Sequence, residues 1–195
     1  MKIEIPHDAK KIGVLCSGGV DSTLLLYLLV KQNLKSNLQI ISFSNVKPDQ
    51  KTCVENVFSW IKEELNYNLQ NYMVRFGWIR QMVSDILQVY DMDYVFTGCN
   101  KVVWDENEFT PTIVIPHDNP PKRGDPLNEK HLRPFINIDK LEITKLYLDN
   151  HILDLLYLTR SCGHTTGYSS PCGGCYFCTE RKWALSKLEL EDIYK

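Results

Sequence analysis

The stretch Ile12-Gly13-Val14-Leu15-Cys16-Ser17-Gly18-Gly19-Val20-Asp21-Ser22 decides the fold of this chain. Its first five residues form an apolar run that predicts a buried strand, and the leucine-rich segment 21–30 predicts a helix. Backbone N–H groups and the N-terminus of a helix converge on anions at such a connection. The sequence therefore predicts a phosphate loop over residues 17–22, whose candidate ligands are Ser17, Gly18, Gly19, Val20, Asp21 and Ser22.

Each residue type in this loop suits the binding of a phosphate. The glycines allow close approach of the backbone, and Ser17 and Ser22 supply hydroxyl groups. Asp21 can cap the helix or help to place a magnesium-bound water. No lysine follows the loop, so it is not a Walker-A site. The alternative interpretation is a tight turn whose serine and aspartate only cap the helix.

Strand and helix patterns alternate outward from the loop. Strands are expected at residues 12–16, 38–43, 72–76 and 94–98, and helices at residues 21–30, 51–65, 78–90, 139–149 and 176–191, with a short apolar piece at 152–158. This order predicts an α/β fold in which helices cover both faces of a parallel sheet. Residues 100–137 are rich in proline, and such a long irregular stretch is more often functional than idle.

Composition limits the classes of protein that fit. The chain has 195 residues, 44% of them hydrophobic and 24% charged, which excludes long disorder and fibrous repeats. A net charge of -2 argues against coating nucleic acid through bulk charge. The longest apolar run, residues 24–30, is far shorter than the roughly 20 residues that span a bilayer, and no export signal precedes it. A cytoplasmic protein with no membrane association is expected.

Four of the seven cysteines crowd near the C-terminus with the spacing C-x9-C-x2-C-x2-C: Cys162, Cys172, Cys175 and Cys178. Four thiolates suit a tetrahedral Zn²⁺, and a closed ligand set indicates a structural role. His164 in place of one thiolate, an iron–sulfur cluster and four unliganded thiols are the alternatives. Cys16, Cys53 and Cys99 lie in or beside apolar stretches, where buried thiols are expected. We expect a zinc-binding subdomain at residues 159–195, beside a nucleotide-binding domain at residues 1–158.

The motif Ser-Gly-Gly-x-Asp-Ser after a first strand resembles the pyrophosphatase-loop family of ATP-using enzymes. This resemblance implies an adenine nucleotide alpha hydrolase-like, Rossmann-like fold. It also implies cleavage of ATP between the α- and β-phosphates with Mg²⁺, and transfer of AMP to an oxygen of the substrate. The loop would then hold the departing pyrophosphate, because N–H donors are most useful where negative charge accumulates.

Further motifs resemble the 7-cyano-7-deazaguanine synthase family of queuosine biosynthesis. They are Ser161-Cys162, the segment 171–178, Arg181, Gly98-Cys99-Asn100, and Arg133-Pro134-Phe135 with Lys140 and Glu142. The resemblance implies a ligase that adenylates 7-carboxy-7-deazaguanine, forms the amide with ammonia, and dehydrates it to the nitrile with a second ATP. It implies catalytic roles for Asp21, Lys101 and Lys140, with Arg133 as a further cation, and nucleotide binding by Gly98 and Asn100.

Two segments depart from that family. Its Pro-x-Arg-Asn segment is absent, with Ile79-Arg80-Gln81 in that place, and residues 104–109 replace its Tyr-Pro-Asp-Cys-Arg stretch. These regions would shape the substrate pocket and any homodimer contact. A relative that stops at the amide, or that adenylates another carboxylate, therefore remains an alternative.

Two other functions stay open. A tRNA thiolase of the same superfamily would need a reactive cysteine, for which Cys99 is the candidate, and a non-enzymatic zinc ribbon would bind nucleic acid or protein. For the small-molecule ligase, nucleic acid is not expected as a direct substrate. Asp105 is a candidate contact for Mg²⁺ or substrate, whereas the histidines are expected at the surface or in loops: His7, His117, His131 and His151.

Overall fold

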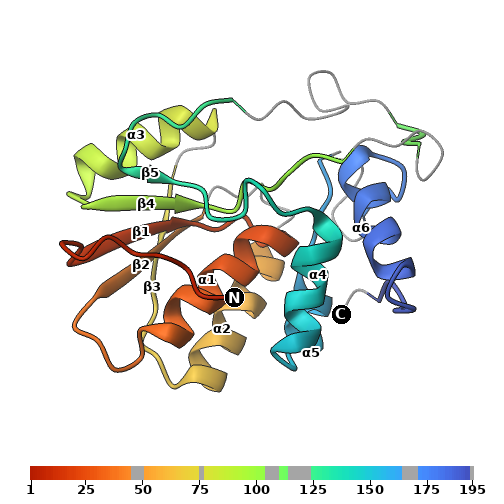
Figure 1. The fold of residues 1–195 in the computed structure, drawn as a ribbon, viewed down its shortest axis with the longest axis horizontal. Coiled ribbons are helices and arrows are strands. Elements are labelled where there is room, and N and C mark those ends of the chain that lie inside the picture. Colours follow the sequence, from red (N-terminus) through yellow and green to blue (C-terminus); the bar gives the residue numbers. More distant parts are fainter. Residues whose placement is uncertain (45–50, 75–76, 104–109, 114–123, 164–170, 194–195) are drawn as a thin grey trace.

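The computed structural model describes residues 1–44, 51–74, 77–103, 110–113, 124–163 and 171–193 (Figure 1). Its elements, in chain order, are β1 (Lys11–Leu15), α1 (Val20–Gln32), β2 (Gln39–Ser44), α2 (Lys51–Leu65), β3 (Gln70–Met73), α3 (Ile79–Val89), β4 (Tyr94–Thr97), β5 (His131–Leu132), α4 (Lys140–Asp149), α5 (Leu153–Leu158) and α6 (Tyr176–Ser186).

The strands form one five-stranded parallel sheet in the order β3-β2-β1-β4-β5. The chain leaves β1 toward β2 on one side and later returns to β4 on the other, so the order of strands switches between β1 and β4. In open parallel sheets, ligands bind outside the carboxyl ends of the strands at such a switch point. The phosphate loop follows β1 directly and therefore lies at this point.

Helices pack on both faces of the sheet, as the sequence predicted. Ile12 and Val14 of β1 belong to a core built with α1, α2, α4 and α5. Leu15 points to the opposite face, where it joins a second core with Met82 and Ile86 of α3. Alternate residues of a strand face opposite sides, so α3 covers one face and α1 with α2 the other.

Two strands differ from the expected pattern. The third strand begins and ends earlier than expected, at Gln70–Met73 rather than at 72–76. The fifth strand, β5, was not predicted, because it has only two residues and lies within the proline-rich stretch. It pairs with β4 and forms the edge of the sheet that is followed by α4.

Local chemistry fixes the beginning of α4. Asp139 is the N-cap, its carboxylate accepts a hydrogen bond from the backbone N–H of Glu142 (2.9 Å), and the Glu142 carboxylate accepts one from the N–H of Asp139 (3.0 Å). This reciprocal capping box satisfies two N–H groups that the helix leaves free. It also sets Lys140 as the first helical residue, with its side chain directed toward the phosphate loop.

The C-terminal helix is joined to the rest of the chain by a buried arginine. Arg181 of α6 donates hydrogen bonds to the carbonyl oxygens of Leu156 and Thr159 and to the Thr159 hydroxyl, at 3.3, 3.2 and 2.6 Å. Its Nε is 2.8 Å from the Asp192 carboxylate. Arg181 therefore satisfies carbonyl groups at the end of α5, a structural role in this molecule. None of the helices in the described residues is long and apolar enough to cross a membrane.

Candidate functional site

The phosphate loop is a tight turn held by its own serines. The Ser22 hydroxyl accepts a hydrogen bond from the Ser17 N–H (3.1 Å), lies 3.2 Å from the Ser17 hydroxyl, and donates to the carbonyl of Gly19 (3.3 Å). Gly18 has a φ of +73°, and a Cβ there would lie 2.8 Å from the Val54 side chain of α2. Only glycine fits this position without a shift of the neighbouring helix.

Gly98, expected to help bind the nucleotide, lies against the backbone of the phosphate loop. A Cβ at Gly98 would approach the Ser22 nitrogen to 2.7 Å and the Asp21 carbonyl carbon to 2.9 Å. The missing side chain therefore allows the carboxyl end of β4 to pack on the first turn of α1. Gly98 shapes the site by this close approach of two backbones.

Asp21 does not cap α1, which was one of its two expected roles. The N-cap is Gly19, and no side chain caps this helix. The Asp21 carboxylate instead forms an ion pair with the ammonium of Lys140 from α4. Two of the three residues expected to be catalytic are thus in direct contact, although 119 positions separate them in the chain.

A third ionisable group, Glu180 of α6, completes the cluster. Its Oε2 lies 3.5 Å from the Lys140 ammonium. Its Oε1 accepts hydrogen bonds from the Asn100 amide (3.4 Å) and the Tyr176 hydroxyl (3.1 Å). Asn100, expected to bind nucleotide, therefore lies at the cluster. We call Asp21, Lys140 and Glu180 the charge triad.

Two other predicted cations lie apart from the triad's contacts. Lys101 has an exposed side chain, and its backbone N–H donates to the Ile138 carbonyl at 2.8 Å. Arg133 donates to the carbonyl of Gly124. Catalytic involvement of Lys101 stays a prediction. Asp105 and the rest of segment 104–109 lie outside the described residues, as do His117 and His164.

The expectation that His131 is a surface or loop residue is wrong. It lies in β5 with 5% of its surface exposed. Its Nδ1 accepts a hydrogen bond from the Leu127 N–H (3.1 Å), so the neutral ring carries its proton on Nε2 and donates to the Thr97 hydroxyl (2.9 Å). Burial, with smaller contributions from Arg133 and Arg80, lowers the pKa of His131 from 6.5 to about 4. The expectation failed because β5 itself was not anticipated.

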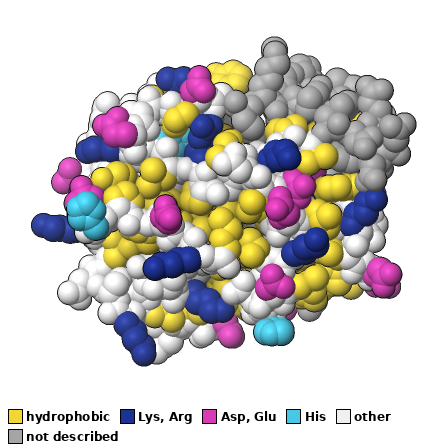
Figure 2. Space-filling view, viewed as in Figure 1, with side chains coloured by type: hydrophobic (Ala, Val, Ile, Leu, Met, Phe, Trp, Pro, Cys, Tyr) yellow, Lys and Arg dark blue, Asp and Glu magenta, His cyan; other side chains and the backbone are white. Residues whose placement is uncertain are grey.

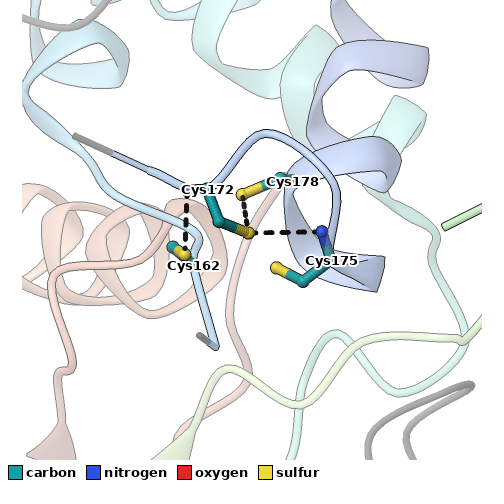
Figure 3. Close-up of side chains that lie close together, drawn as sticks. All are labelled: Cys162, Cys172, Cys175 and Cys178. Carbon is teal, nitrogen blue, oxygen red and sulfur yellow. Dashed lines mark hydrogen bonds between the residues drawn. The ribbon is translucent and has the colours of Figure 1, made fainter. Parts of the chain in front are cut away.

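The four clustered cysteines converge on one point (Figure 3). Their sulfur atoms all lie within 4.8 Å of one another, and the Sγ atoms of Cys172 and Cys178 are 3.9 Å apart. Backbone N–H groups of Cys172 and Cys175 point at the sulfurs of Cys162 and Cys172, at 3.4 and 3.3 Å. Hydrogen bonds from Cys162 and Cys178 lower the pKa of the Cys175 thiol. The set offers four ligand atoms for one metal ion.

The cysteine cluster contacts the phosphate loop through the segment that precedes Cys162. The backbone N–H of Arg160 donates to the Gly18 carbonyl (2.9 Å), and the Val20 N–H points at the Ser161 hydroxyl (3.5 Å). The Cys178 thiol in turn donates to the Ser161 carbonyl (3.4 Å). Ser161 therefore lies between two motifs that are far apart in the sequence.

Part of the proline-rich stretch also packs on this cluster. The backbone N–H groups of Thr112 and Ile113 both donate to the carbonyl of Gly174, at 2.9 and 3.0 Å, and Tyr176 donates to the carbonyl of Val103 (2.8 Å). The irregular chain that follows β4 is thus held against the cysteine cluster and the start of α6.

The other three cysteines have different environments. Cys16 and Cys53 are buried, as expected, and burial raises the pKa of both, that of Cys53 to about 11. Cys53 donates to the carbonyl oxygens of Leu158 (3.0 Å) and Gly18 (3.6 Å), so its thiol links the backbone of the phosphate loop to the end of α5. The expectation that Cys99 is buried as well is wrong, because its side chain is partly exposed at the end of β4, where the Thr97 hydroxyl points at its sulfur at 3.6 Å.

Comparisons with known proteins identify the fold. No protein-family model matches the sequence, and no curated protein matches it. Among solved structures, NMN synthetase from Francisella tularensis is similar over 95% of this chain and 79% of its own, with 13% identity and a TM-score of 0.55. The U34-tRNA thiolase NcsA from Methanococcus maripaludis, solved with its 4Fe-4S cluster, is similar over 92% of this chain, with 15% identity and a TM-score of 0.50.

The chain spans 65% of the thiolase's length. At these identities the similarity concerns the fold. Together with the five-stranded parallel sheet and the four convergent cysteines, it shows an adenine nucleotide alpha hydrolase-like fold that carries a C-terminal cysteine cluster able to hold a metal ion.

Proposed function

We propose that the protein is an ATP-dependent ligase that transfers AMP to a carboxylate and then replaces the AMP with ammonia. The observation that carries this proposal is the phosphate loop at the switch point of the sheet, with Lys140 paired to Asp21 beside it. Backbone N–H groups, hydroxyls and one ammonium are the donors that stabilise charge on departing pyrophosphate. A carboxylate beside them suits the Mg²⁺ that accompanies ATP.

The chemistry requires little from the protein beyond positioning and charge neutralisation. An oxygen of the substrate carboxylate attacks the α-phosphorus of ATP, and pyrophosphate leaves with the electron pair of the broken P–O bond. Ammonia then attacks the acyl carbon, AMP leaves, and a proton passes to solvent. A site that aligns the two reactants and excludes water makes the reaction between them effectively unimolecular, which increases its rate.

The substrate that the motifs favour is 7-carboxy-7-deazaguanine. This assignment rests on the resemblance of Ser161-Cys162, the segment 171–178 and Gly98-Cys99-Asn100 to the 7-cyano-7-deazaguanine synthase family. In a second cycle the amide oxygen attacks the α-phosphorus of another ATP and pyrophosphate leaves, and loss of AMP and of both amide protons then gives the nitrile. Both cycles use the same activation, so one phosphate loop serves them.

The spacing of the four cysteines favours one Zn²⁺. At a Zn–S distance of about 2.3 Å, tetrahedral geometry places neighbouring sulfurs about 3.8 Å apart. A cubane cluster separates its four cysteine sulfurs more widely, by about 6 Å, because an iron lies behind each. Sulfurs within 4.8 Å of one another fit the single ion, which Cys162, Cys172, Cys175 and Cys178 would hold. With all four ligands from protein, its contribution would be to stability.

One observation supports thiolation of tRNA as a second candidate. Cys99 is partly exposed at the carboxyl end of β4, close in sequence to Gly98, which packs on the loop. Thiolation would require this thiol, whereas amide formation would not. Cys99→Ser therefore separates the two functions, since unchanged production of AMP and amide favours the ligase.

The deciding experiment supplies the purified protein with Mg²⁺, ATP, ammonium and 7-carboxy-7-deazaguanine, and follows AMP and deazaguanine products by mass spectrometry. Nitrile with AMP supports the full proposal, and amide with AMP supports a ligase that stops at the first step. AMP without an altered base points to another acceptor. If neither product forms and no nucleotide binds, a zinc-ribbon interaction module becomes the better interpretation.

A further inference from the structure

Glu180 is a buried carboxylate on the helix that begins at the cysteine cluster. It is 0% exposed and lies two residues after Cys178, on the first turns of α6. Burying a charge costs several kcal/mol unless partners compensate it. Its partners come from three separate segments: the Asn100 amide, the Tyr176 hydroxyl and the Lys140 ammonium.

The two carboxylates that flank Lys140 are not equivalent. The side chain of Asp21 is 19% exposed, whereas that of Glu180 is 0% exposed and that of Lys140 is 3% exposed. Asp21 belongs to the phosphate loop, and the described residues give its carboxylate one ion-pair partner, Lys140. Glu180 is fixed by hydrogen bonds on the side away from Lys140. Asp21 can therefore exchange its partner, and Glu180 cannot.

The net charge of the triad also distinguishes the role of Asp21 from that of Glu180. Two carboxylates and one ammonium give the triad itself a net charge of about -1, beside a loop that Arg160 also adjoins. A divalent cation bound at Asp21 would offset this charge. A cation coordinated by Asp21 would draw this carboxylate away from Lys140, and a buried ammonium left without any partner would be costly.

We infer that Glu180 is a positioning residue, which keeps the Lys140 ammonium beside the phosphate loop when Asp21 turns to the cation that accompanies ATP. This inference rests on the proposed function and adds to it a residue that the family motifs do not contain. It also gives α6 a second role, because the helix that starts at the cysteine cluster carries the fixed counter-ion of the site.

The test is Glu180→Gln, which keeps the size of the side chain and the oxygen that accepts from Asn100 and Tyr176 but removes the charge. Asp192→Asn is the matched control, because it weakens the ion pair of the neighbouring Arg181 without touching Lys140. Rates of AMP formation, binding of α,β-methylene-ATP with Mg²⁺, metal content and melting temperature are measured for both variants and for Glu180→Asp.

Without the fixed charge, Lys140 stays with Asp21 during the reaction. The expected result for Glu180→Gln is a kcat reduced about tenfold or more with a KM for ATP changed less than about threefold, because the lost interaction acts in the transition state. Metal content and melting temperature should match those of Asp192→Asn, and Glu180→Asp should recover part of kcat.

A wild-type kcat in Glu180→Gln would overturn the inference. So would a loss of rate that Asp192→Asn shares and that follows metal content or melting temperature, since that pattern means a purely structural role. The proposed function is tested by the wild-type protein, without any variant. If the wild-type protein binds no α,β-methylene-ATP, both the proposed function and this inference are contradicted.

Discussion

Lys140 carries its charge in an almost water-free position between two carboxylates. A pair of this kind adds little net stability, but removal of one partner leaves a buried charge uncompensated. One of these carboxylates, Asp21, belongs to the phosphate loop. Substitutions at Lys140 should therefore affect both activity and stability.

Lys140→Met keeps the length of the side chain and removes its charge. Under the proposed function we expect AMP formation to fall by at least about 100-fold, since Lys140 would be a donor to the reacting phosphates. We also expect the free energy of unfolding to fall by about 3 kcal/mol, since the buried Glu180 carboxylate loses its ion pair with Lys140. Activity assays and urea unfolding measure the two effects. The control is Lys145→Met, an exposed lysine of the same helix, and an equal loss there would contradict the assignment.

Asp21→Ala and Ser17→Ala test the phosphate loop directly. Each should abolish AMP formation while circular dichroism and the melting transition stay close to those of the wild-type protein, because Ser17 is exposed, Asp21 is partly exposed, and Lys140 keeps Glu180 as its ion-pair partner. Normal turnover in either variant would contradict the role of the loop in ATP cleavage.

Gly98→Ala tests whether two backbones must meet at the site. The added Cβ would lie 2.7 Å from the Ser22 nitrogen, so either β4 or the first turn of α1 has to move. Overpacking of this kind costs about 1–3 kcal/mol, and a shifted loop should also lose affinity for ATP. Thermal unfolding and calorimetry with α,β-methylene-ATP measure the effects. Gly77→Ala, where a Cβ meets nothing within 4 Å, should leave both unchanged.

At the scale of elements, β5 depends on a neutral histidine. The His131 ring bridges the Thr97 hydroxyl of β4 and the Leu127 N–H before β5, and the bond from Leu127 requires the uncharged form, because a protonated Nδ1 cannot accept it. The pKa of His131 is lowered to about 4 in the folded protein, from 6.5 in the unfolded chain. Below pH 6.5 the unfolded chain binds a proton that the folded protein does not, so acid favours unfolding.

The stabilising contribution of His131 is therefore present above pH 6.5 and is lost as the pH falls toward 4. Between pH 7 and pH 5 the loss should be about 2 kcal/mol. His131→Gln offers an amide donor and acceptor that do not titrate, and urea unfolding at both pH values should show a smaller change for this variant. Equal changes in the two proteins would mean that folding does not lower the pKa of His131.

Elements were predictable where the signal was local. The apolar run of β1 and the spacing of α2 and α3 mark their own secondary structure, and the parallel sheet followed from their alternation. Strand β5 gives no such signal, because two residues have no measurable period and its stability comes from pairing with β4. The burial of His131 was missed for the same reason.

The residues of the candidate site could likewise be predicted only where their signal in the sequence is local. The loop at residues 17–22 is contiguous, and Lys140 carries a motif, so both could be found in the sequence. Glu180 is an acidic residue on a helix that carries other charges, and only tertiary structure brings it to Lys140. In the structure the adjacent Glu180 and Arg181 are both buried. Nothing in one sequence distinguishes such residues from a solvated surface pair.

At the scale of the whole molecule, the cysteine cluster joins the C-terminal helix to the sheet. Figure 1 shows α6 beside α4 and α5, away from β3, and Figure 2 shows charged side chains of both signs scattered over this face. Between the cluster and the phosphate loop lie two residues that directly precede Cys162, Arg160 and Ser161. A metal at the cluster would therefore stabilise the loop as well as α6.

Cys175→Ser should lower metal content and melting temperature together, because binding free energy at a structural site is folding free energy. Elemental analysis distinguishes one zinc per chain from iron, and thermal unfolding with and without a chelator measures the stability. Cys99→Ser is the control outside the cluster, and it should keep the metal. A metal-free Cys175→Ser protein with wild-type stability would show that the cluster is not a structural site.

The charge triad also has a consequence for how the protein is made. Lys140 follows Asp21 by 119 residues, and Glu180 comes later still, so the three groups form contacts of very high sequence separation. Contacts of this kind form late in folding, because ordering the long chain between the residues costs conformational entropy before the contact adds any stabilising energy. During synthesis from the N-terminus, the phosphate loop can fold while α6 is still inside the ribosome. A chain at that stage has its phosphate loop but not its fixed counter-ion, so under the proposed function the site would be complete only after α6 has emerged and folded.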